Sequence, residues 1–163
     1  MESRVKLLGH PIHPMLVVVP LGLFIGAVVF DAIYLWNGSA SVATVGYWNI
    51  VGGIVGGLLA AVFGLIDWLA IPAGTRAKRI GILHALSNVV AILGFAYVFW
   101  MRYNSVDLAT TTGLFAVEVM ALLIGAVGGW LGGELVDRLG VGVDNGANLN
   151  APNSMSGRQR RAA

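Results

Sequence analysis

Four long apolar segments constrain the fold of this chain more than any other feature of its sequence. They lie at about 14–36, 46–71, 80–101 and 108–136. Each can cross the hydrocarbon core of a bilayer, about 30 Å thick, as a helix of about 20 residues. Charged residues make up only 11% of the chain, whereas a soluble domain carries about 25%. Because the connections are short, the sequence predicts an all-α integral membrane protein, an antiparallel four-helix transmembrane bundle surrounded by the lipid bilayer.

The basic residues predict the orientation of this bundle. Nine of the ten Lys and Arg residues flank the apolar segments on one side, and Arg102 alone lies on the other. Under the positive-inside rule both termini are then cytoplasmic. These residues form no continuous basic face, so no nucleic-acid partner is expected. Aromatic side chains predict a belt at the outer interface, formed by Trp36, Tyr47, Trp48, Tyr97, Trp100 and Tyr103.

The composition divides the chain into two parts. Residues 1–144 are expected to form one transmembrane domain. Residues 145–163 have no periodic apolar face, which predicts a disordered cytoplasmic tail. Arg158, Arg160 and Arg161 in this tail are expected to contact anionic lipid, each contributing about 1 kcal/mol near the surface.

Small residues predict how the helices pack. The second segment contains Gly53, Gly56, Gly57, Ala60 and Gly64, and the fourth contains Gly125, Gly128, Gly129, Gly132 and Gly133. Such small-xxx-small patterns let membrane helices approach closely. They predict packing surfaces within the bundle, or a homo-oligomer formed through the second and fourth helices.

Polar residues gather at one predicted depth, within two turns of the cytoplasmic surface. All four helices contribute to this inner layer, which consists of His10, His13, Asp67, His84, Asn88 and Glu134. Ionisable groups at membrane depth are costly and usually face the bundle interior. This convergence is the best functional signal in the sequence.

Two kinds of cofactor suit the inner layer. A b-type haem needs two axial histidines, and we expect His13 and His84 in that role, with His10 as the alternate. Asp67 and Asn88 would then orient the imidazoles. Alternatively, a transition metal ion would take its ligands from His10, His13, His84, Asp67 and Glu134. A third interpretation needs no ligand, because these groups can satisfy one another and backbone carbonyls.

A thinner polar layer is predicted near the opposite ends of the helices. Asp31, Glu118 and Arg102 lie there, and Arg102 can pair with either carboxylate. A structural ion pair is one interpretation, and part of a proton or ion path is the other. The apolar middle of the helices offers no relay between the two layers.

No enzyme signature is present. The chain has no cysteine, P-loop, G-x-S-x-G or H-E-x-x-H sequence. The sequence therefore favours a membrane component that binds haem or metal for electron transfer with a redox partner. Alternatives are a non-catalytic structural or interaction module and a small proton-coupled transporter, although an inverted repeat or broken helices typical of transporters are not evident.

Three stretches together resemble a bacterial membrane-protein family, catalogued as domain of unknown function 2231. They are GHPIHPMLVVVPLGLFIGAVVFD (9–31), GLIDWLAIPAGTRAKRIGILHALSN (64–88) and GGELVDRLGVGVD (132–144). The resemblance covers about residues 8–144 and implies a multi-pass protein of the cell (cytoplasmic) membrane. Some relatives are joined to Rieske iron–sulfur domains, which implies redox work by analogy. Many relatives resemble His-Phe where this chain has Val18-Val19, so a ligand at that position would be missing here.

Overall fold

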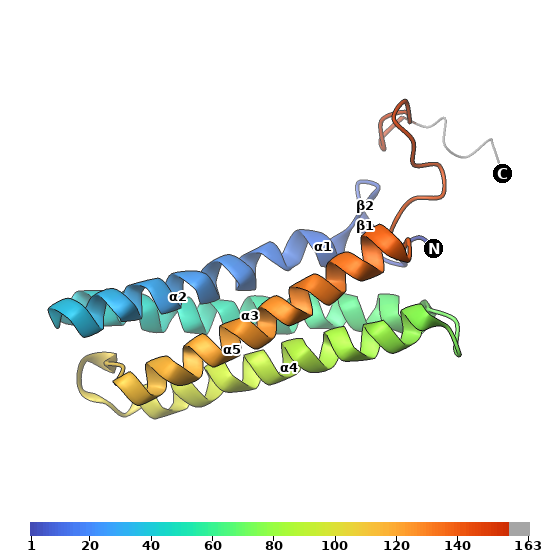
Figure 1. The fold of residues 1–163 in the computed structure, drawn as a ribbon. Coiled ribbons are helices and arrows are strands. Elements are labelled where there is room, and N and C mark those ends of the chain that lie inside the picture. Colours follow the sequence, from blue (N-terminus) through green and yellow to red (C-terminus); the bar gives the residue numbers. More distant parts are fainter. Residues whose placement is uncertain (157–163) are drawn as a thin grey trace.

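The structure is a computed structural model that describes residues 1–156. Its helices are α1 (Ile12–Leu16), α2 (Val18–Asn37), α3 (Ala40–Ala70), α4 (Arg76–Tyr103) and α5 (Thr112–Gly133). Strands β1 (Lys6–Leu7) and β2 (His10–Pro11) form a short hairpin before α1. A 3₁₀ turn, η1 (Val106–Leu108), precedes α5, and a π-helical turn, η2 (Glu134–Arg138), follows it (Figure 1). Arg158, Arg160 and Arg161, which are expected to contact lipid, lie outside the described residues.

Four helical spans in residues 1–156 are long and apolar enough to cross a membrane, which confirms the predicted all-α membrane bundle. They are Ile12–Asn37, Ala40–Ala70, Arg76–Tyr103 and Thr112–Arg138. The chain runs up and down the bundle, so its N-terminus and C-terminal segment lie at the same end (Figure 1). We call this the histidine end, because His13 and His84 lie there, and we call the opposite end the Arg102 end.

The helix ends differ from the apolar segments for local reasons. Thr75 and Thr111 cap α4 and α5, because their side chains accept hydrogen bonds from the backbone N–H groups of Lys78 and Leu114. The helix thus begins at a polar cap rather than at the first apolar residue. α5 begins four residues later than the fourth apolar segment, since Asp107 and Leu108 have φ of 56° and 53°, which a right-handed helix excludes.

Proline explains the division of the first span. α1 and α2 meet at Val17, three residues before Pro20. Proline has no N–H to donate to the carbonyl of residue i−4 and its ring crowds that carbonyl. Pro14 is tolerated because it lies in the first turn of α1.

Two helical hairpins, α1–α3 and α4–α5, meet through equivalent positions. The ring centroids of His13 and His84 are 6.2 Å apart, and the rings of Phe24 and Phe95 stack at 4.0 Å. Asp31 and Arg102 form an ion pair, and their separation of 71 positions is the same as in the other two pairs. When a residue of one half contacts the residue at the corresponding position of the other half, the two lie on either side of a two-fold axis. Because both hairpins begin at the histidine end, this pseudo-two-fold axis runs along the bundle.

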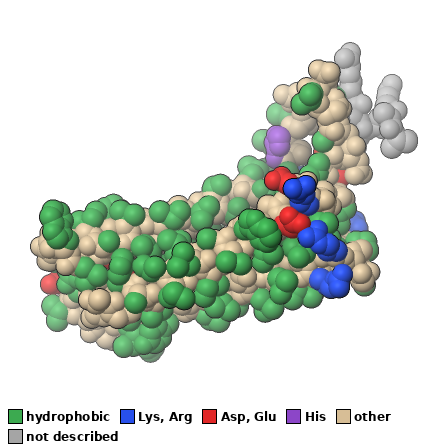
Figure 2. Space-filling view, in the orientation of Figure 1, with side chains coloured by type: hydrophobic (Ala, Val, Ile, Leu, Met, Phe, Trp, Pro, Cys, Tyr) green, Lys and Arg blue, Asp and Glu red, His purple; other side chains and the backbone are tan. Residues whose placement is uncertain are grey.

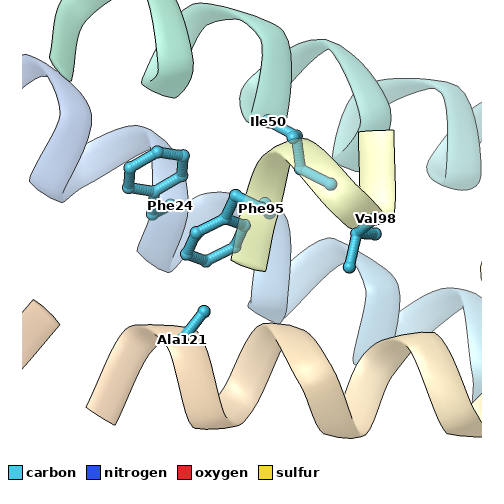
Figure 3. Close-up of a cluster of buried hydrophobic side chains, with 6 residues drawn as sticks. Phe24, Ile50, Phe95, Val98 and Ala121 are labelled. Carbon is cyan, nitrogen blue, oxygen red and sulfur yellow. The ribbon is translucent and has the colours of Figure 1, made fainter. Parts of the chain in front are cut away.

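The core lies around the middle of this axis. Phe24 and Phe95 pack there with Ile50, Val98 and Ala121 (Figure 3), and Ala27 completes the buried cluster. The outer surface is largely apolar along the length of the helices, as the green side chains in Figure 2 show. This pattern suits a bundle whose solvent is lipid.

Five of the six side chains predicted for the aromatic belt are exposed at the Arg102 end. The exposed members at the Arg102 end are Trp36, Trp48, Tyr97, Trp100 and Tyr103. Tyr47 is instead only 3% exposed, and its ring stacks on Phe99 at 5.5 Å. The sequence predicts the depth of Tyr47 along the bundle. Its burial depends on the side of α3 from which it projects, and that side faces Phe99.

The glycines fall into two groups that the sequence pattern does not separate. A Cβ atom at Gly53 would overlap the ring of Phe24, and one at Gly56 would come within 2.9 Å of Val19. These glycines allow α2 and α3 to pack closely. A Cβ atom at Gly129 or Gly133 would meet nothing within 4 Å, so the face of α5 that carries these two glycines does not pack against the rest of the bundle.

We expect Gly53→Ala to destabilise the bundle and Gly129→Ala to leave its stability unchanged or slightly raised. Overpacking a core costs about 1–3 kcal/mol, and alanine favours an open helical position by up to about 1 kcal/mol. Thermal unfolding in detergent, followed by circular dichroism, measures both effects. Equal losses in the two variants would contradict the packing assigned to Gly53.

Candidate functional site

His13 and His84 occupy matching environments in the two hairpins. Nδ1 of His13 lies 2.9 Å from the backbone oxygen of Ala60 on α3. Nδ1 of His84 lies 2.8 Å from the backbone oxygen of Gly128 on α5. A carbonyl oxygen can only accept a hydrogen bond, so each Nδ1 is the donor. In the neutral imidazole, Nε2 is then left with a lone pair that can bind a metal.

Glycine makes room for each imidazole. A Cβ atom at Gly64 would come within 2.8 Å of Cε1 of His13, and one at Gly132 within 3.2 Å of Cε1 of His84. Each glycine lies one helical turn after the residue whose carbonyl binds the same histidine. α3 and α5 thus hold the two rings with the same pair of positions, and the ring planes are nearly perpendicular, at 84°.

Asn88 supports the backbone beside His84 more than the ring itself. Its Nδ2 donates to the carbonyl oxygen of His84 at 2.8 Å, and lies 3.4 Å from Nδ1 of the same residue. The Asn88 side chain also packs on Gly128, where a Cβ atom would come within 2.7 Å of it. The amide fills the space next to the carbonyl that receives the His84 hydrogen bond.

The other predicted site residues have separate partners. His10 is exposed on β2, with Nε2 3.4 Å from Oγ of Ser154. Glu134 pairs with Arg76 at 2.6 Å. In the part of the chain that the structure describes, no group of three or more His, Cys, Asp or Glu side chains is arranged to hold a metal ion. The structure therefore brings His13 and His84 together, but does not gather the five-residue metal set.

Asp67 fastens the N-terminal segment to α3. Its carboxylate accepts hydrogen bonds from Oγ of Ser3, at 2.7 and 2.9 Å to its two oxygens, and from the backbone N–H of Arg4 at 2.7 Å. Ser3 is 7% exposed. The sequence indicated that Asp67 faces inward, yet nothing in it identified Ser3 as the partner.

Charged residues join the two terminal segments outside the membrane spans. The ammonium group of Lys6 contacts Glu2 at 2.6 Å and Asp144 at 3.3 Å. The hydrogen bond from Lys6 lowers the pKa of Glu2, and the backbone N–H of Gly146 and then Lys6 lower the pKa of Asp144. Because the pKa values of Glu2 and Asp144 are lowered, this contact contributes its full stabilisation at pH values above about 4, the ordinary pKa of a carboxyl group. The stabilisation is lost as the pH falls through the lowered pKa values.

Arg102 contacts both carboxyl groups at its end of the bundle. Its Nη1 lies 2.5 Å from Oδ2 of Asp31 and 3.5 Å from Oε1 of Glu118. Nη2 donates to the carbonyl of Ala43, and Nε donates to that of Leu108, both at 2.9 Å. The side chains of Asp31, Arg102 and Glu118 are all fully buried. The sequence indicated the pairing, and the Ala43 and Leu108 carbonyls are the partners it missed.

These features define a multi-pass helical membrane protein with one polar cluster near each end of the bundle. The chain belongs to the family described as predicted membrane protein (DUF2231), whose model matches residues 9–145. Comparisons with curated proteins and with solved structures found no match. The predicted family membership is therefore confirmed, and the family description supplies no activity.

We expect Asp67→Ala to release the N-terminal segment. Losing hydrogen bonds to a charged group costs about 1.5–3 kcal/mol, which corresponds to about a tenfold or larger rise in the open population. Limited trypsin digestion after Arg4 and Lys6 should accelerate accordingly. Asp137→Ala, which removes an exposed carboxylate from η2, is the matched control, and equal acceleration in both variants would contradict the role of Asp67.

Proposed function

We propose that the protein binds one b-type haem between His13 and His84 and serves as an electron-transfer component of the membrane. The observation that carries this proposal is the matching pair of imidazoles, each anchored through Nδ1 to a backbone carbonyl. Histidine ligands of metals almost always donate their other ring N–H to such a partner, which fixes the tautomer and raises the basicity of Nε2.

The two imidazoles come from different hairpins and lie close together. Their ring centroids are 6.2 Å apart. Two histidines this close would be able to hold one haem jointly.

The number of available side chains also favours haem over a bare ion. A haem brings four ring nitrogens and needs two protein ligands, whereas a structural metal ion needs about four protein ligands. A metal ion held by His10, His13, His84, Asp67 and Glu134 would require Asp67 to release Ser3 and Arg4, and Glu134 to release Arg76. This set therefore remains the second choice.

This chain's residues would contribute three things to a bound haem. His13 and His84 would hold the haem through their ring nitrogens, with the rings oriented by the backbone oxygens of Ala60 and Gly128. Gly64 and Gly132 would keep the rings in place by letting them pack closely against α3 and α5. The haem itself supplies one-electron chemistry. The apolar bundle limits access of water, one of the factors that tune a haem potential.

Charge placement supports an orientation with the histidine end in the cytoplasm. Lys and Arg side chains gather at that end on the face in Figure 2, while the rest of that face has none. Arg102, at the other end, is fully buried against carboxyl groups. With the positive-inside rule, this distribution favours a site in the cytoplasmic half of the cell membrane, accessible to a redox partner.

A non-catalytic interaction module is the second candidate. The open positions at Gly129 and Gly133 are spaced one turn apart on α5, a pattern that allows close approach by a second membrane helix. In that case the histidines would only hold α1 to α3 and α4 to α5. A homo-oligomer formed through these glycines is compatible with either candidate.

An optical spectrum of the detergent-purified protein tests the haem proposal. We expect a Soret band that shifts on reduction with dithionite, and its loss in His13→Ala and in His84→Ala. His10→Ala is the matched control and should retain the band. A colourless protein, produced with ample haem and free of bound transition metal by elemental analysis, would overturn the proposal and favour the interaction module.

A further inference from the structure

The buried cluster at the Arg102 end contains more acid than base. Asp31 comes from α2, Glu118 from α5, and the single guanidinium of Arg102 from α4. The side chains of all three are 0% exposed. If both carboxyl groups were ionised, the cluster would hold one uncompensated negative charge among fully buried side chains, which is costly inside a membrane protein.

The contacts distinguish the two acids. Asp31 receives a short charged hydrogen bond from Arg102 at 2.5 Å. Glu118 has only two long contacts, from Oγ1 of Thr110 at 3.4 Å and from Arg102 at 3.5 Å, both to Oε1. Such distances provide weak stabilisation for a buried anion. Asp31 therefore has the environment of a carboxylate, and Glu118 has that of a neutral acid.

Each carboxyl group of the cluster has one buried oxygen atom without a hydrogen-bond partner. Oδ1 of Asp31 and Oε2 of Glu118 have no hydrogen-bond partner among the described residues. The two carboxyl groups also converge on the same atom, because Oδ2 of Asp31 and Oε1 of Glu118 both contact Nη1 of Arg102. A single proton would convert Glu118 into a donor toward Asp31 and cancel the excess charge. A metal cation fits less well, because Na⁺-like or Ca²⁺-like ions take about six or more oxygen ligands.

We infer that Glu118 and Asp31 form a proton-binding site, in which Glu118 holds the proton and donates it in a hydrogen bond to Asp31, with Arg102 as the fixed counter-charge. Binding adds one proton from water to the Glu118 carboxylate and changes the charge of the cluster from −1 to 0. The other titratable groups nearby do not supply this charge. Tyr47 on α3 presents its ring 5.8 Å from the guanidinium, and Asp107 in η1 is exposed.

The cluster lies apart from the histidine end. The stacked rings of Phe24 and Phe95 lie between it and the two histidines. Thr110 and the carbonyl of Leu108 contact the cluster at the Arg102 end. The proton site is therefore independent of whether His13 and His84 bind haem.

Infrared spectroscopy of the unmodified sequence tests this inference directly. We expect one C=O stretching band of a protonated carboxyl group to persist at pH 8. It should shift when glutamate is labelled with ¹³C at its side-chain carboxyl, and stay in place when aspartate is labelled. The chain has three glutamates, Glu2, Glu118 and Glu134, and Glu2 and Glu134 are paired with Lys6 and Arg76. No such band, or a shift with aspartate alone, would overturn the assignment.

Two neutral variants give a second test. Glu118→Gln keeps the shape and a hydrogen-bond donor, so we expect the melting temperature in detergent to change by only a few degrees, with loss of the infrared band. Asp31→Asn leaves Arg102 without its close counter-ion and should lower the melting temperature much more. Glu134→Gln is the control, which should retain the band. A larger loss in Glu118→Gln than in Asp31→Asn, with the band absent from the unmodified protein, would show that Glu118 is ionised.

Discussion

Polar side chains between membrane helices must find their partners within the protein, because the hydrocarbon core offers none. In this bundle those partners are arranged along one axis. His13 and His84 are each held by a backbone carbonyl of their own hairpin, and the buried guanidinium of Arg102 is held by two carboxyl groups and two carbonyls. Close helix packing follows from this requirement, since the imidazoles can reach those carbonyls only where glycine leaves the space.

The two hairpins are related by a pseudo-two-fold axis, although few of their corresponding residues are identical. At a separation of 71 positions, the facing pairs are His13 with His84, Phe24 with Phe95, and Asp31 with Arg102. The first two pairs are identical in type and the third is opposite in charge. Such parallel repeats, related by an axis along the membrane normal, are a known architecture of membrane proteins. Along this axis, two identical imidazoles face each other near one end of the bundle, and an acid faces a base near the other.

Much of this arrangement could be predicted from the sequence, and the remainder depended on helix rotation. Length and hydropathy were sufficient for the four spans, and depth along each helix was sufficient to group the histidines with Asp67 and Glu134. Depth does not determine which way a side chain faces. Asp67 therefore binds the N-terminal segment and Glu134 binds Arg76, while His10 lies on a hairpin whose tight turn, at Leu8 and Gly9, has positive φ at both residues. Every residue has a backbone carbonyl, so the sequence does not show which one accepts a given hydrogen bond. The Ala60 and Gly128 partners of His13 and His84 therefore could not be predicted.

The charge opposition at the Arg102 end has a consequence for how the chain assembles. Two copies of the first hairpin, associating through the same face, would set Asp31 against Asp31, and two copies of the second would set Arg102 against Arg102. Either pairing would bury like charges, whereas the histidine and phenylalanine pairs would permit both. The single exchange of an acid for a base between the halves thus discriminates against self-association of each half. It makes the unlike hairpins of one chain the favoured partners while the protein is being inserted into the membrane.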